Sequence, residues 1–141
     1  MNVKKLIKKY LKMSFYELVN LAVAKYNSIY NNLFEETNNE KVVESFLSGI
    51  VMTCLSIDGK LSEKEWTFLQ HYNKNLSYNE ALKQIKEYCE KSNIEIIKKE
   101  INNYYSLKEE LIELCAIIFS VDGEVEEWES SFLVDLIKMK K

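Results

Sequence analysis

Turn-forming residues are scarce in this chain of 141 residues, which has no Pro and only three Gly. Sheet proteins reverse direction often and use Pro and Gly in many of their turns, so this scarcity disfavours a β-rich fold. The composition is otherwise that of a globular protein, because 47% of the residues are hydrophobic and 29% are charged. We therefore expect one domain that spans residues 1–141.

Arginine is absent, and all nineteen basic residues are Lys. The formal net charge is −3 at pH 7, so the chain as a whole does not attract nucleic acid. Recognition of bases and phosphates relies strongly on the bidentate guanidinium group of Arg. We therefore expect no nucleic-acid partner.

Long apolar runs are also missing, and none approaches the ~20 residues that cross a bilayer. The N-terminal lysines are not followed by the apolar block of a secretory signal. Cys54, Cys89 and Cys115 are odd in number and widely spaced, which argues against a disulfide framework or a cysteine zinc site. Together these absences predict a cytoplasmic protein.

What the chain does contain is a recurring signal for the start of a helix, the capping box S/T-x-x-E. It occurs at Ser14/Glu17, Thr37/Glu40, Ser62/Glu65, Ser77/Glu80, Ser92/Glu95 and Ser106/Glu109. Apolar residues at helical spacing follow these pairs. We therefore predict an all-α fold, a bundle of about seven to eight helices. The helices are expected near residues 3–12, 15–35, 38–56, 62–73, 78–90, 93–104, 107–120 and 126–138.

Two stretches share one sequence pattern at a spacing of 64 residues. They read S-I-D-G-K-L-S-E-K-E-W-T-F-L at 56–69 and S-V-D-G-E-V-E-E-W-E-S-S-F-L at 120–133. Each follows an apolar helical pattern and leads into another. We therefore predict an internal repeat over 40–70 and 104–137, in which two helix–turn–helix units form a pseudo-twofold pair. Residues 1–35 are predicted to be an N-terminal helical extension.

The Asp-Gly stretches are similar to the second half of an EF-hand calcium loop. Placing Gly59 at loop position 6 puts Asp58 at position 5 and Glu65 at position 12, as an EF-hand requires. Loop position 1, however, falls on Cys54 in the first stretch and on Ile118 in the second. Calcium needs an oxygen ligand there, so the stretches are not EF-hands.

The two stretches instead resemble the repeated motif of TerB-like domains, which belong to the tellurite-resistance TerB family. In that motif an apolar helix ends at Asp-Gly, and an apolar residue, polar residues, a Glu and a further apolar run follow. The matching regions, 40–70 and 104–137, cover somewhat under half of the chain. The family usually has Ala before Asp-Gly, where this chain has Ile57 and Val121. The resemblance implies an all-helical fold with two motifs related by internal symmetry.

The resemblance also implies a set of candidate metal ligands, the acids of the two motifs. These are Asp58 and Glu65 in the first copy, and Asp122 and Glu129 in the second. Two carboxylates 4 Å apart repel by about 4 kcal/mol at an effective dielectric constant of 20. If the two turns converge, we therefore expect a divalent cation, the lysines of a partner, or raised pKa values to relieve the repulsion.

A purely structural interpretation of the same acids stays open. Glu65 can complete the capping box of Ser62, and an Asp before Gly can bind the backbone amides of its own turn. Glu129 is harder to explain in this way, because Glu126 is a poor residue for the N-cap position.

The other reactive side chains do not form a catalytic pattern, and we predict no enzymatic activity. His71 is the single histidine and is expected on the surface. Cys54 and Cys115 lie on apolar helix stripes and are expected in the core. Trp66 and Trp128 occupy non-equivalent positions after the two motifs, and at least one is expected to face solvent or a partner.

The N-terminal helix is basic and amphipathic. It combines Lys4, Lys5, Lys8, Lys9 and Lys12 with Leu6, Ile7, Tyr10 and Leu11. Such a helix can lie on anionic lipid, which makes it a candidate for peripheral membrane contact. The favoured interpretation is that its apolar face packs on the domain.

Taken with the resemblance, the sequence predicts a non-catalytic bacterial binding module with a role in stress resistance, including resistance to tellurite, or in defence. Its acidic turns are expected to bind a divalent cation or a protein partner, and no other cofactor is expected. The alternative is a purely protein-binding acidic protein, of the immunity or adaptor type, whose Asp-Gly turns hold no metal.

Overall fold

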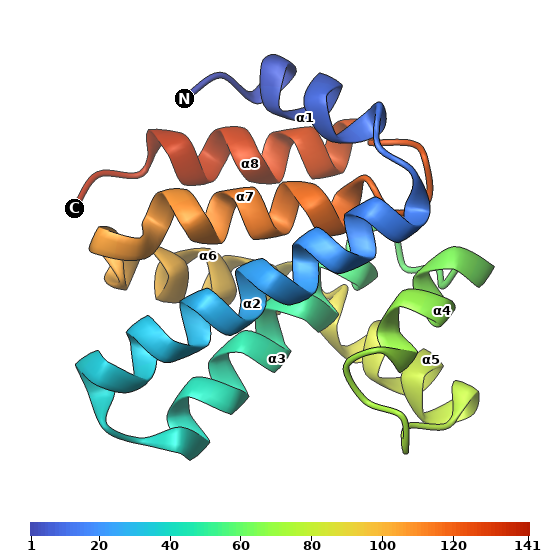
Figure 1. Cartoon of the computed structure of the whole chain (residues 1–141), viewed down its shortest axis with the longest axis horizontal. Coiled ribbons are helices and arrows are strands. Elements are labelled where there is room, and N and C mark those ends of the chain that lie inside the picture. Colours follow the sequence, from blue (N-terminus) through green and yellow to red (C-terminus); the bar gives the residue numbers. More distant parts are fainter.

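The computed structural model describes the backbone of residues 1–141 and every side chain except that of Ser92. Within this described backbone the chain forms eight α-helices, one short 3-10 helix and no β-strand (Figure 1). The helices are α1 (Val3–Leu11), α2 (Phe15–Thr37), α3 (Glu40–Ser56), α4 (Glu63–Gln70), α5 (Tyr78–Tyr88), α6 (Lys91–Asn103), η1 (Tyr105–Leu107), α7 (Lys108–Phe119) and α8 (Glu127–Lys138). The all-α prediction is confirmed, and each predicted helix end lies within three residues of the observed one.

Several helix starts follow from the capping boxes. Complete boxes begin α2 at Ser14 and α4 at Ser62. At the start of α5 the Ser77 hydroxyl accepts a hydrogen bond from the Glu80 amide at 3.2 Å. In each case the hydroxyl satisfies an amide that has no partner within the helix, which fixes where the helix begins.

At two other positions the predicted capping box was wrong. Thr37 ends α2 rather than starting α3, because Asn38 adopts the left-handed conformation (φ 49°) that terminates a helix. Asn39 then caps α3 by accepting from the amide of Val42. Ser106 lies inside η1, which leads directly into α7 without a side-chain cap.

At a third position, α6 begins at Lys91 with Glu90 in the N-cap position. The box predicted there depends on the Ser92 side chain, which lies outside the described part of the structure.

Helices α3 and α7 form the centre of the fold. In α3 every residue of 47–56 is buried except Ser48, and in α7 every residue of 111–119 is buried except Glu113. A helix that is apolar on nearly all sides has to be covered on nearly all sides. Accordingly, α2 contacts both helices, α5 and α6 contact α3, and α1 and α8 contact α7 (Figure 1).

The Lys-rich helix α1 packs on α7 and α8. Tyr10 is buried, and Val3, Leu6 and Ile7 pack against the core, while the lysines stay exposed. The apolar face is thus used in the fold, as favoured from the sequence, and contact of the lysines with lipid stays a prediction. In the described part of the chain, no helix is both long enough and apolar enough to cross a bilayer.

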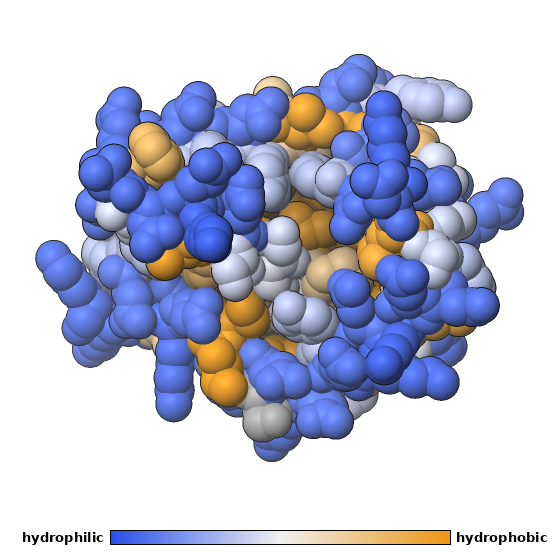
Figure 2. All heavy atoms as spheres, turned by 90° about the horizontal axis from the view of Figure 1, so that it is seen from below, coloured by the Kyte–Doolittle hydropathy of each residue, from blue (hydrophilic) through white to orange (hydrophobic). Residues whose placement is uncertain are grey.

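Hydrophilic side chains dominate the face shown in Figure 2, and hydrophobic atoms are visible between them, some deep in a hollow near the centre. Among the exposed large hydrophobic residues, Trp128 stands out with 71% of its area exposed. Trp66 is partly buried, and its ring meets that of Tyr78 edge to face with the centroids 5.4 Å apart. The prediction that at least one tryptophan faces outward is confirmed by Trp128.

Candidate functional site

The turn between α3 and α4 is built by the first Asp-Gly pair. Gly59 has a φ of 72°, which residues with a side chain rarely adopt, and its amide donates to the carbonyl of Ser56 at 2.8 Å. Oδ1 of Asp58 accepts a hydrogen bond from the amide of Lys60 at 3.0 Å. Together the glycine conformation and the aspartate bond stop α3 and redirect the chain.

The turn between α7 and α8 repeats this pattern. Gly123 has a φ of 90°, and its amide donates to the carbonyl of Ser120 at 3.0 Å. Oδ1 of Asp122 accepts from the amide of Glu124 at 3.1 Å. Both aspartates therefore have a structural role in their own turns.

The glutamates of the two motifs hold the N-termini of the outgoing helices. Oε1 of Glu65 accepts from the amide of Ser62 at 2.9 Å, and Oε1 of Glu129 accepts from the amide of Glu126, also at 2.9 Å. The expectation that Glu129 is harder to explain structurally was wrong. Its carboxylate performs the N3 half of a capping box even though residue 126 has no hydroxyl.

The likeness of the two motifs is strongest at the turns and weaker along the helices. The hydrogen bonds of the aspartates, glycines and glutamates recur at the 64-residue spacing. The outgoing helices differ, since α4 has 8 residues and α8 has 12. A pseudo-twofold relation between complete repeats therefore stays a prediction.

Charges from both turns act on three of the four predicted ligands, Glu65, Asp122 and Glu129. Burial raises the pKa of Glu65 to about 7, helped by the charges of Asp58 and Asp122. Burial likewise raises the pKa of Glu129 to about 8, with further contributions from Asp122, Asp58 and Glu65. Burial and then Asp58 also raise the pKa of Asp122. We call Asp58, Glu65, Asp122 and Glu129 the carboxylate cluster.

The glutamates of the carboxylate cluster are enclosed and the aspartates are partly exposed. Glu65 and Glu129 keep only 6% and 8% of their area exposed, whereas Asp58 and Asp122 are half-buried. Loss of hydration disfavours an ionised carboxylate, and it outweighs the backbone hydrogen bonds that favour ionisation. Near neutral pH each of the two glutamates is therefore present in both its protonated and its ionised form.

The carboxylate cluster is not arranged as a finished metal site. Among the described side chains, no three His, Cys, Asp or Glu residues lie close enough together to hold a metal ion. Each cluster member uses one oxygen in a turn or cap, and no bond among the described residues engages its second oxygen. A cation would have to draw these second oxygens together.

Two thiols lie in the core near the cluster. Cys54 of α3 and Cys115 of α7 are both free and buried, which confirms the prediction that they are core residues. Burial raises the pKa of the Cys54 thiol, and the Cys115 thiol and the Glu129 charge raise it further. No local sequence pattern indicated that the two thiols are neighbours, because their proximity arises from the packing of α3 against α7.

The single histidine has a surface position, as predicted. His71 is exposed at the C-terminal end of α4, and its Nδ1 lies 2.9 Å from the carbonyl oxygen of Thr67. This local contact within α4 accounts for the orientation of the ring.

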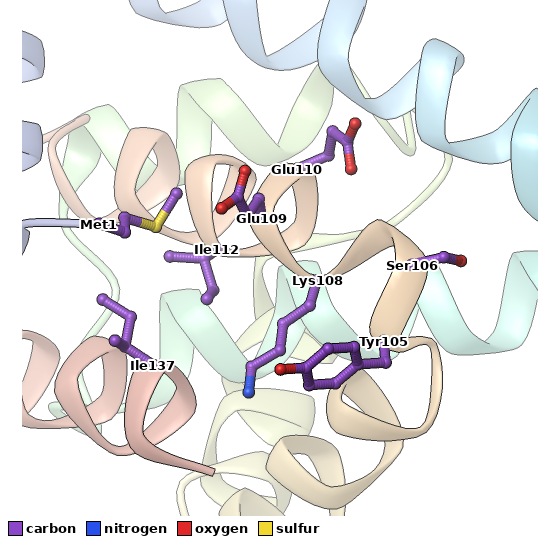
Figure 3. Close-up of a pocket in the computed structure, with 8 residues that line it drawn as sticks. All are labelled: Met1, Tyr105, Ser106, Lys108, Glu109, Glu110, Ile112 and Ile137. Atoms are coloured by element: carbon purple, nitrogen blue, oxygen red, sulfur yellow. The ribbon is translucent and has the colours of Figure 1, made fainter. Parts of the chain in front are cut away.

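A separate pocket of about 410 Å³ lies at the start of α7 (Figure 3). The Lys108 side chain is buried there and extends beside Tyr105, with Nζ 5.1 Å from the ring centroid. The ammonium group donates to Oδ1 of Asn102 at 2.8 Å and to the carbonyl of Met139 at 2.6 Å. Lys108 thus ties the segment after α8 to the rest of the fold.

Replacing Lys108 with Met is expected to lower the free energy of unfolding by about 1–3 kcal/mol. The stem of the side chain is kept, but the Met139 carbonyl and the Asn102 amide oxygen lose a charged donor. Urea denaturation measures the loss, and amide hydrogen exchange of Lys138 and Met139 at the end of α8 should accelerate more than that of α3. Lys99→Met, at an exposed site on α6, is the matched control. Equal stability of the two variants would contradict this role.

No protein-family profile, curated protein or solved structure matches the chain. The TerB-like resemblance therefore rests on the two Asp-Gly motifs at 56–69 and 120–133 alone.

Proposed function

We propose that the protein is a non-catalytic, TerB-like binding module whose carboxylate cluster binds a divalent cation or the basic surface of a partner protein. The role implied by the resemblance is in bacterial stress resistance, including resistance to tellurite, or in defence. The supporting observation is that burial and the charges of acids from both turns raise the pKa values of Glu65, Asp122 and Glu129.

Electrostatics supports a cationic ligand. Two glutamates with pKa values of about 7 and 8 hold protons near neutral pH because their ionised forms are poorly hydrated and face like charges. A divalent cation or a lysine supplies the missing positive charge and displaces those protons. The unused second oxygens of the cluster suit a hard cation that accepts flexible oxygen coordination, such as Ca²⁺ or Mn²⁺.

Isothermal titration calorimetry of the isolated protein with Ca²⁺, Mn²⁺ and Zn²⁺ tests the cation arm of the proposal. At pH 7.5 we expect binding that releases protons, so the measured enthalpy should differ between two buffers of different protonation enthalpy. The double variant Asp58→Asn/Asp122→Asn should bind at least tenfold more weakly, because two ligand charges are removed while the turn geometry is kept.

The matched control is Glu109→Gln/Glu110→Gln, which removes the same charge at the start of α7, beside the pocket of Figure 3. This variant should bind like the parent protein. If none of the three ions gives heat of binding with the folded parent, the cation arm of the proposal is wrong.

The alternative, a purely protein-binding role, is favoured by one other observation. The exposed Trp128 borders a groove of about 320 Å³ between α6 and α8, which Ile94 and Phe132 also line. Tryptophan is enriched among the residues that anchor protein interfaces. A tight basic partner whose binding survives a chelator but is lost in Trp128→Ala would support this alternative over the cation.

A further inference from the structure

The charge of this protein is distributed unevenly along the chain. Residues 1–16 contain five lysines and no acid, because the first acidic residue is Glu17. The other fourteen lysines and all twenty-two acids lie in residues 17–141, which therefore carry a formal charge of −8. Helix α1 is thus a basic element on an otherwise acidic protein.

The fold presents the lysines of this element to solvent. Helix α1 packs on α7 and α8 and lies at the edge of the molecule in Figure 1. Its inner side holds Tyr10, which is 2% exposed, and Leu6 and Ile7 pack against the core beside it. We call the five lysines that remain exposed the basic face; they are Lys4, Lys5, Lys8, Lys9 and Lys12.

The basic face has no counter-charge within the fold. The ion pairs among the described residues engage Lys25 and Lys98, and none of them engages a lysine of the basic face. Lysines four residues apart, such as Lys4 and Lys8, repel each other on a helix and lower its stability. An anionic ligand outside the protein offsets this repulsion.

The composition of α1 and its surroundings favours a lipid surface as that ligand. Lysine binds as a point charge and lacks the bidentate grip of Arg on a single phosphate or carboxylate, whereas clusters of lysines bind anionic membranes through their summed charge. Leu11 and Tyr16, at and just beyond the end of α1, are 39% and 74% exposed. Side chains of these types suit the boundary between lipid headgroups and acyl chains.

We propose that the basic face of α1 docks the folded protein on the surface of a membrane that contains anionic lipids. The apolar side of α1 stays packed on α7 and α8, because its release would expose Tyr10 and the core beneath it to water. Docking is therefore electrostatic and reversible, without insertion of α1 into the bilayer. The carboxylate cluster takes no part in it.

Co-sedimentation of the full chain with lipid vesicles tests the proposal. A chelator is present throughout, so that no divalent cation bridges protein and lipid and the result does not depend on the proposed cation binding. We expect binding to vesicles of equimolar phosphatidylglycerol and phosphatidylcholine, and none to vesicles of phosphatidylcholine alone. Raising the salt concentration from about 0.1 M to about 1 M should abolish binding, because the screening length falls from about 10 Å to about 3 Å.

The test variant is Lys5→Gln/Lys8→Gln, which removes two charges of the basic face. It should bind the anionic vesicles roughly thirtyfold more weakly, since each lysine near such a surface contributes about fivefold to the binding constant. Lys83→Gln/Lys86→Gln is the matched control, because these lysines have the same spacing and are exposed on α5. It should bind like the parent. Absence of binding to the anionic vesicles, equal binding to the neutral ones, or equal loss in both double variants overturns the proposal.

Two further measurements separate docking from other uses of α1. Amide hydrogen exchange of α1 should be no faster on the vesicles than in solution, because the helix stays packed on the core. Faster exchange would show that α1 leaves the core to insert its apolar side, which contradicts the docked geometry. Binding of the parent to poly-L-glutamate but not to the vesicles would assign the basic face to an acidic protein and would also overturn the proposal.

Discussion

The free energy of unfolding is expected to fall as the pH rises from about 5 to 9, and the glutamates of the carboxylate cluster are the cause. The pKa of Glu65 is about 7 and that of Glu129 about 8 in the folded protein, against 4.5 as the ordinary value. Between these limits the folded state binds more protons than the unfolded chain. Raising the pH in this window therefore favours unfolding.

The size of this loss of stability follows from the pKa shifts of Glu65 and Glu129. One pKa unit corresponds to about 1.4 kcal/mol, so each glutamate contributes a loss on the order of 3–5 kcal/mol across the window. This loss of stability does not occur below pH 4.5, where both glutamates are protonated in the folded and in the unfolded chain. It is complete above the pKa values that the glutamates have in the folded protein. A change of this size is a large fraction of the stability of an ordinary domain.

Urea denaturation at a series of pH values measures this effect, with Glu65→Gln/Glu129→Gln as the test variant. Glutamine keeps the hydrogen bond to the N-cap amide but cannot ionise, so most of the pH dependence should disappear. Glu17→Gln is the matched control, because Glu17 also accepts from its N-cap amide (Ser14, 3.1 Å) but is exposed. The free energy of unfolding of this control should depend on pH as it does in the parent protein. If the double variant shows the same pH dependence as the parent, Glu65 and Glu129 are not its cause.

The helices of this fold could be predicted from the sequence because their signals are local. A capping serine and the apolar spacing after it act within one or two turns, as at Ser14 and Ser62. Where the prediction was wrong, a competing local signal was stronger. Asn38 and Asn39 together end one helix and cap the next, so the hydroxyl of Thr37 donates to the Leu33 carbonyl instead.

The sequence predicted which residues belong to the candidate site, but not how those residues are buried or arranged. The Asp-Gly pattern pointed to Asp58 and Asp122, and the structure brings Asp58 near enough for its charge to raise the pKa of Asp122. The burial of Glu129 and the approach of Cys54 depend on how α3, α7 and α8 pack, which no local pattern encodes.

Replacing Phe119 with Ala is expected to destabilise the protein by about 3–5 kcal/mol. Phe119 ends α7 and is fully enclosed, and its ring meets that of Phe132 on α8 edge to face with the centroids 5.6 Å apart. Truncation removes this contact and leaves a cavity that the packed centre cannot close. Phe34→Ala on α2 is the control, because 39% of Phe34 is exposed and little should be lost there.

The Phe119 contact also links the core to the carboxylate cluster, because it joins α7 to α8 and Glu129 lies in the first turn of α8. If α8 loosens from α7, water reaches this carboxylate and its pKa falls towards the ordinary value. Phe119→Ala should therefore lose more stability at pH 6 than at pH 9, as measured by urea denaturation at both pH values. The milder Phe119→Leu serves if the alanine variant does not fold. Equal losses at both pH values would show that the burial of Glu129 does not depend on this contact.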